Sequence, residues 1–129
     1  MSLITVSEVR EALGDAYSTE PSDEVISSYI DKREAELKEI VGLEDLTTSS
    51  YQSLLKRWLL NKVCIDVVKR DLIGKDSADN LDYSLGEFRE SKDTNIKLKL
   101  NLIETMEQAA ENALQMYFAK TVSYQAVNP

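Results

Sequence analysis

Residues 51–73 read YQSLLKRWLLNKVCIDVVKRDLI, and this stretch decides the fold of the chain. Its large apolar side chains recur at helical spacing, but they cover a wider arc than the single buried stripe of a surface helix. The set consists of Tyr51, Leu54, Leu55, Trp58, Leu59, Leu60, Val63, Cys64, Ile65, Val67, Val68, Leu72 and Ile73. We therefore predict a helix over about 49–73 that is buried on more than one side and forms the centre of the fold.

Two helices are predicted before this central one. Thr5 and Glu8 have the T-x-x-E spacing of a capping box, and Gly14 lies where a glycine often ends a helix. Ser22 is a favourable N-cap for a second helix, which we expect over about 23–41. This second helix alternates one apolar stripe with a charged face, so it should lie on the surface of the core.

A long helix is predicted after the central one, beginning near residue 93 or 94. Its apolar residues keep helical spacing for roughly 27 residues, and Leu98 and Leu102 widen the apolar arc. At 1.5 Å per residue this helix would be about 40 Å long. Because a compact domain of this size does not need such a length, part of the helix should project or pack on another copy. The last residues, 122–129, lose the pattern and are predicted to form an extended tail.

The stretch LDYSLGEFRES, residues 81–91, differs from the helical segments on either side of it. Apolar and polar residues alternate here as they do in a strand. The predicted fold is therefore an all-α bundle of about four helices in a single domain, 1–129, with a protruding loop or short β-hairpin around 79–92.

Composition excludes several function classes. The chain has 129 residues, no histidine, and 23 acidic against 15 basic residues, which gives a net charge of −8. This charge disfavours general DNA affinity, because phosphate binding needs clustered Lys and Arg. The lone cysteine, Cys64, is expected to be a buried apolar residue, and no cofactor, catalytic or metal site is predicted. No apolar run is long enough for a membrane-spanning helix, and MSLITVSEV does not resemble a secretion signal, so we expect a protein of the cytosol or of something assembled there.

The order of these elements resembles the small head–tail connector, or adaptor, proteins of tailed bacteriophages. LITVSEVREALG, residues 3–14, is similar to the family's opening helix, T-x-x-E-V-[KR]-x-x-L. PSDEVISSYIDKREAELKEIVG, residues 21–42, is similar to its second helix, D-x-x-[IL]-x-x-[YL]-I-x-x-A-x-x-x-[IV]. YSLGEFRES, residues 83–91, is similar to its S-x-S-[IL]-G-[DE]-x-S loop, although Phe88 and Arg89 stand where small polar residues are common. Together these segments cover most of the chain.

The resemblance implies a structural role without catalysis. Such proteins form a ring, usually dodecameric, that docks on the portal after DNA packaging. The ring extends the DNA exit channel and offers a platform to the next neck or tail protein. We therefore expect a virion protein of the neck, assembled in the host cytoplasm, whose partners are its own copies, the portal protein and the next neck or tail protein. DNA would pass through the ring without specific binding, and no membrane is involved.

Two segments are candidates for contact with a neighbouring subunit or the portal. In the mid-chain stretch the residues are Leu81, Tyr83, Leu85, Gly86 and Phe88. In the predicted tail they are Val122, Tyr124 and Val127. The alternatives are a solvent loop folded on its own core and a frayed terminus.

Glu104, Glu107 and Glu111 share one face of the last helix. A solvated face explains them better than a metal site, because di-metal bundles pair such carboxylates with histidine. Within a ring they are candidates for an acidic channel lining, as are the acids of the loop. The competing function is a stand-alone acidic helical module that binds one partner, and a third possibility is a small enzyme.

Overall fold

The computed structural model of the chain describes residues 2–73 and 94–127, with side chains over 2–72 and 96–121. These residues form four α-helices and two 3₁₀ turns, with no strand among them. The elements are α1 (Val6–Leu13), η1 (Asp15–Tyr17), α2 (Asp23–Val41), η2 (Leu46–Thr48), α3 (Gln52–Ile73) and α5 (Thr94–Val127). The predicted all-α class is confirmed for this part of the chain, whereas the loop or hairpin predicted around 79–92 lies outside the described residues.

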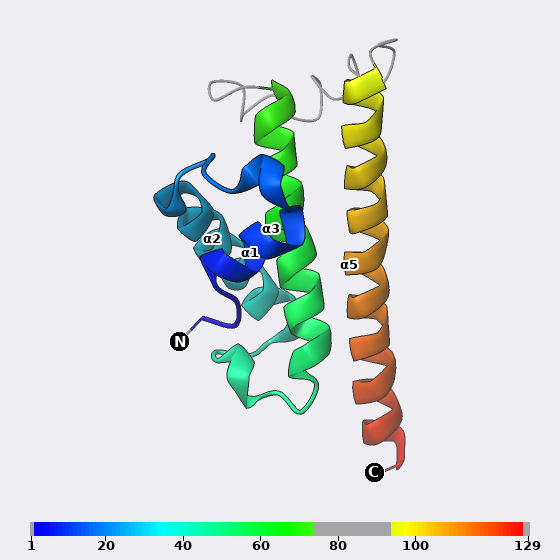
Figure 1. Ribbon diagram of the computed structural model, residues 1–129. Helices are drawn as coiled ribbons and strands as arrows, with labels where there is room; N and C mark the ends of the chain where they lie inside the picture. The colour runs from blue at the N-terminus through cyan, green and yellow to red at the C-terminus, as the bar shows by residue number, and fades with distance from the viewer. Residues whose placement is uncertain (1, 74–93, 128–129) are drawn as a thin grey trace.

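The central helix, α3, lies between two groups of elements. In Figure 1, α1 and α2 cover one side of α3, and α5 runs along the other side. Leu55, Leu59 and Val63 have no exposed surface, and Trp58 is 3% exposed. The prediction of a helix buried on more than one side is therefore confirmed, although α3 begins at Gln52 rather than at 49.

Local sequence signals set the start of α1 and both ends of α2, as predicted. The backbone N–H of Glu8 donates to the Thr5 hydroxyl at 3.2 Å, and the Thr5 N–H donates to the Glu8 carboxylate at 3.2 Å, which completes the capping box of α1. The Ser22 hydroxyl accepts a hydrogen bond from the first turn of α2. At the other end Gly42 adopts a left-handed conformation with φ 72°, and its N–H donates to the Lys38 carbonyl at 2.9 Å.

An ion pair joins α2 to α3. Arg33 donates to both carboxylate oxygens of Asp66, with Nε–Oδ2 at 2.8 Å and Nη2–Oδ1 at 2.6 Å. The two side chains are only 21% and 16% exposed, so this bidentate contact lies in the seam between the helices.

α5 runs antiparallel to α3 and, being longer, extends beyond the lower end of α3 in Figure 1. Midway along this seam the Lys62 Nζ lies 3.0 Å from a Glu107 carboxylate oxygen. Toward the C-terminal end of α5 the rings of Tyr51 and Tyr117 meet edge to face, with their centroids 6.3 Å apart. Apolar side chains fill the space between these contacts, so α5 belongs to the same core as the other helices.

The predicted extended tail is wrong for residues 122–127. α5 continues through them to Val127 and has 34 residues, about 51 Å at the helical rise. The loss of the apolar pattern after residue 121 suggested an extended chain, but a helix can continue without that pattern where its residues have adequate helix propensity. Neither glycine nor proline interrupts the helix before Pro129, so nothing in the sequence stops it earlier.

Candidate interaction surface on α5

Much of the apolar surface that the described residues leave in solvent lies on α5. Five large apolar side chains are exposed in this part of the chain, and four of them belong to α5. They are Leu98 at 60%, Leu102 at 43%, Met116 at 45% and Phe118 at 39%, while the fifth, Ile40 at 39%, belongs to α2. Packing against α3 therefore does not cover all the apolar surface of α5.

Three of these side chains belong to one straight row along the helix, which we call the α5 row. The row consists of Leu98, Leu102, Thr105, Ala109, Asn112 and Met116. Successive members are alternately four and three residues apart, and at 100° per residue they stay within about 40° of one line. This alternation is the spacing by which one helix packs along another.

The α5 row is distinct from the face of α5 that packs on α3. The buried face consists of Leu100, Ile103, Met106, Ala110, Ala113 and Tyr117. Its centre lies about 110° around the helix from the row. On the other side the row is flanked by a line of exposed polar side chains, three of them charged: Lys97, Asn101, Glu104, Gln108, Glu111 and Gln115. α5 thus has one apolar face inside the subunit and, outside it, a row of apolar and neutral side chains with a polar flank.

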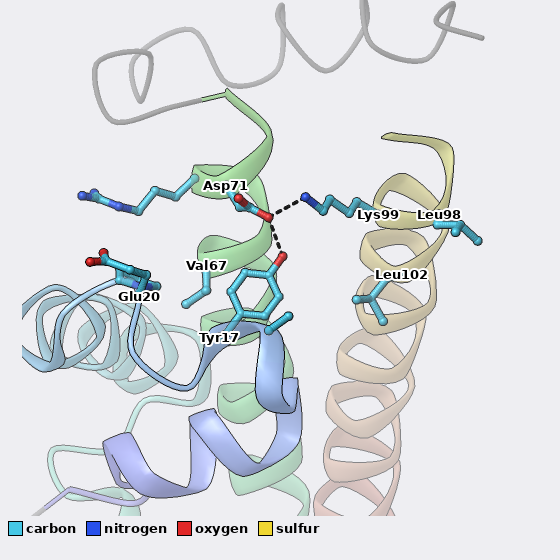
Figure 2. Close-up of a pocket in the computed structure, with 10 residues that line it drawn as sticks. Tyr17, Glu20, Val67, Asp71, Leu98, Lys99 and Leu102 are labelled. Atoms are coloured by element: carbon cyan, nitrogen blue, oxygen red, sulfur yellow. Dashed lines mark hydrogen bonds and ion pairs between the residues drawn. The ribbon is translucent and has the colours of Figure 1, made fainter. Parts of the chain in front are cut away.

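A cleft of about 460 Å³ adjoins the N-terminal end of the row. Leu98 and Leu102 of α5 line the cleft together with Val67 of α3 and Tyr17. Figure 2 shows Leu102 facing Tyr17 and Val67, whereas the Leu98 side chain points away from them. Pro21 completes the apolar lining. The cleft and the row therefore form one continuous surface.

A network of three polar side chains spans the cleft and connects three elements. Asp71 of α3 accepts a hydrogen bond from the Tyr17 hydroxyl at 2.7 Å (Figure 2). The same carboxylate forms an ion pair with Lys99, whose Nζ is also 2.7 Å away. Tyr17 belongs to η1 and Lys99 to α5. The carboxylate thereby connects the N-terminal end of α5 to the rest of the bundle.

The network changes the titration of its members. Burial, reinforced by the hydrogen bond to the Asp71 carboxylate, raises the pKa of Tyr17 well above its ordinary value. For Asp71 burial acts to raise the pKa, but the contacts from Lys99 and Tyr17 outweigh it and lower the pKa below its ordinary value of 3.8. The network is therefore held by a neutral tyrosine and an ionised aspartate across the neutral pH range.

The three glutamates predicted to share a face do so, but they differ in their contacts. Glu107 is half-buried and paired with Lys62 in the seam, whereas Glu104 and Glu111 are exposed. Glu111 accepts a hydrogen bond from Gln115 at 3.3 Å. Among the residues that the structure describes, no group of three or more His, Cys, Asp or Glu side chains is placed to hold a metal ion.

Cys64 is a buried residue of α3, as predicted. It is 3% exposed, and burial together with the charge of Asp66 raises the pKa of its thiol to about 12. A thiol with this pKa is protonated at neutral pH, so Cys64 contributes packing.

The predicted contact residues fall into two groups. The mid-chain set, Leu81, Tyr83, Leu85, Gly86 and Phe88, lies outside the described residues. Val122, Tyr124 and Val127 lie within α5 rather than in an extended tail.

The sequence interpretation noted Leu98 and Leu102 but missed the row as a whole. Its signal, the alternating spacing from Leu98 to Met116, was available, but Thr105 and Asn112 interrupt its apolar character. No local signal predicts the contact of Tyr17 with Asp71, since the two residues are 54 positions apart.

Within 2–73 and 94–127, no helix has both the length and the apolar character needed to cross a membrane. Comparisons with protein family models, with curated proteins and with solved structures found no match to this chain.

Proposed function

We propose that this protein is a structural subunit of a phage neck, which forms a ring below the portal and connects the capsid to the tail. The proposal starts from the resemblance of three segments to head–tail connector proteins. A compact helical bundle with one long helix on its outside is compatible with this role. Its partners would be other copies of the chain, the portal protein and the next neck or tail protein.

One observation carries the proposal: α5 has an apolar row that its own subunit leaves in solvent. Leu98 and Leu102 are 60% and 43% exposed, and Met116 is 45% exposed. Leu98 and Leu102 are neighbours one turn apart, and adjoining exposed apolar side chains mark a surface that another protein can cover. In a ring, neighbouring subunits or the portal would cover the row.

The charge of the chain supports passage of DNA rather than binding. A net charge of −8 repels a duplex, and the exposed Glu104 and Glu111 add acid to the outer surface of α5. Their assignment to the channel wall is part of the proposal. Glu107 contributes less to such a lining because Lys62 neutralises it.

The second candidate is a stand-alone helical module that binds a single partner. The cleft beside Leu98 and Leu102 favours it, because an apolar groove with a polar rim can receive one segment of another protein. A module of this kind would stay monomeric or dimeric at every concentration and would not recognise a portal.

Electron microscopy of the protein mixed with the portal of the same virus tests the choice. The connector proposal predicts an added ring of density below the portal, with the symmetry of a closed ring. The matched control is Ile40→Lys, which changes an exposed apolar residue on α2 and should leave the added ring in place. A portal without added density, at protein concentrations far above those of the portal, would contradict the proposal.

A further inference from the structure

We propose that in the free protein the α5 row is covered by the α5 row of a second copy, with the two helices antiparallel. The starting observation is that the row is long, straight and exposed, while the opposite side of α3 carries α1 and α2 (Figure 1). The inference concerns the free chain, and it does not depend on the proposed function.

The spacing of the row is compatible with a helix as its occupant. Alternating steps of four and three residues keep the row on one line of α5, along which a second helix can pack its side chains between those of the row. From Leu98 to Met116 the row covers five such steps, about 27 Å of helix. An extended peptide, with its repeat of two residues, would match only part of it.

The absence of charge favours a second copy over an unrelated partner. The chain carries a net charge of −8, so two copies repel each other over most of their surfaces. The α5 row itself contains no charged residue, whereas its outer flank also carries Lys97, Glu104 and Glu111. Lys99, which borders the row, is already paired with Asp71 of its own subunit. A basic partner attracted by the net charge would find no carboxylate in the row.

The order of side-chain sizes along the row favours the antiparallel arrangement. Large apolar residues lie at the ends, and the small Thr105 and Ala109 lie in the middle, where two helices can approach most closely. In an antiparallel pair centred there, Leu98 of each copy lies opposite Met116 of the other. Met116 of the second copy then reaches the apolar cleft beside Leu98, so both exposed ends are covered at once. The helix dipoles also oppose each other in this arrangement.

The pair should be weak and exchangeable. A row about 27 Å long on a helix about 10 Å across offers a contact smaller than that of stable specific complexes, which bury about 1,200 Å² or more. We therefore expect a dissociation constant in the micromolar range or above. Because a twofold contact closes after two copies, the pair occupies the row without forming larger assemblies. A stronger partner in an assembly can replace the second copy.

Sedimentation velocity over a concentration series tests the pairing. Wild-type protein should pass from monomer to dimer as the concentration rises. Leu102→Lys places a charge in the row and should weaken the dimer by about tenfold or more, because that charge must lose its water in the contact. Leu102 is 43% exposed, so the monomer should keep its fold, and an unchanged far-UV circular dichroism spectrum verifies this.

Ile40→Lys is the matched control, since it adds the same charge at a similarly exposed apolar residue on α2. It should dimerise like the wild type. A wild-type protein that remains monomeric at millimolar concentration would overturn the proposal, as would equal weakening by the two substitutions.

Disulfide trapping tests the orientation. Leu98→Cys and Met116→Cys chains are mixed and mildly oxidised, and Cys64 does not interfere because it is buried. The antiparallel pair predicts a disulfide between the two different chains. Disulfides only between identical chains, Leu98→Cys with itself or Met116→Cys with itself, would show a parallel pair and overturn the proposed arrangement.

Discussion

Arg33 and Asp66 form a largely buried ion pair in the α2–α3 seam. Arg33→Ala leaves the Asp66 carboxylate, 16% exposed, without its two hydrogen bonds at 2.8 and 2.6 Å. We expect the free energy of unfolding to fall by about 2 kcal/mol, because a largely buried charge loses its partner. Urea denaturation measures this loss.

Lys56→Ala is the control for that substitution. It breaks the more exposed ion pair with Glu8, in which the side chains are 45% and 33% exposed. The expected loss is below about 1 kcal/mol, since water solvates both groups. Equal losses in the two variants would show that burial does not strengthen the Arg33 contact.

Asp71 makes the attachment of α5 sensitive to acid. The contacts from Lys99 and Tyr17 outweigh burial and hold the folded-state pKa of Asp71 below 3.8. Its contribution to stability is therefore fully present above pH 3.8 and is lost as the pH falls through the lower, folded-state pKa. The difference in unfolding free energy between wild type and Asp71→Asn should be constant near neutral pH and shrink below about pH 4.

Thermal or urea unfolding of both proteins between pH 7 and pH 2 measures this difference in unfolding free energy. Lys99→Met serves as the second variant, since it removes the cation that lowers the Asp71 pKa and should reduce the pH dependence. A difference between wild type and Asp71→Asn that does not change with pH would contradict the assigned role of the carboxylate.

Residue-scale predictions from sequence succeeded where the signal is local. Thr5 with Glu8, Ser22 and Gly42 act within one helical turn, so their spacing alone determines what they do. The contact between Tyr17 and Asp71 has no such signal, because it exists only after η1 and α3 have packed together.

The seam between α3 and α5 depends on small side chains at the element scale. Ala110 has no exposed surface and lies on the face of α5 toward α3. Ala110→Leu should separate the two helices and cost about 1–3 kcal/mol of unfolding free energy, because the seam has no room for the added volume. Ala119→Leu adds the same volume at an exposed position of α5 and should be nearly neutral. Similar losses at both positions, measured by urea denaturation, would contradict the proposed seam.

Helices were predictable from periodicity, but the C-terminal end of α5 was not. The predicted bounds of α2 and α3 agree with the structure to within three residues. Capping residues mark the ends of α2, and the wide apolar arc of α3 makes that helix easy to recognise. In α5 the apolar pattern is lost after residue 121, and the helix continues to Val127 because neither glycine nor proline interrupts it. The α5 row was hidden for a related reason, since its polar members conceal the spacing from a count of apolar residues alone.

At the scale of the whole molecule, the net charge of −8 opposes association of identical chains, while the α5 row permits it. Added salt screens the repulsion and leaves contacts among uncharged side chains intact. Raising the ionic strength from about 0.05 M to about 0.5 M should therefore strengthen the dimer, as sedimentation measures it. A dimer that weakens with salt would instead indicate pairing through ionic contacts.

Sequence could predict that this molecule leaves apolar surface for a partner, because the last helix is longer than its own core requires. It could not predict which part of that helix is left uncovered. Which part is uncovered depends on which face of α5 turns toward α3. The packing of Ala110, Ala113 and the other residues of the seam together determines that orientation.

The most direct measurement of the central claim follows the methyl group of Met116 by NMR as the protein concentration rises. Met116 is 45% exposed in the α5 row, whereas Met106 is 9% exposed in the seam with α3 and serves as the internal reference. We predict that the Met116 methyl signal shifts with concentration toward a buried environment, while the Met106 signal stays where it is. A Met116 signal that does not move up to millimolar concentration would contradict the claim that another copy covers the row.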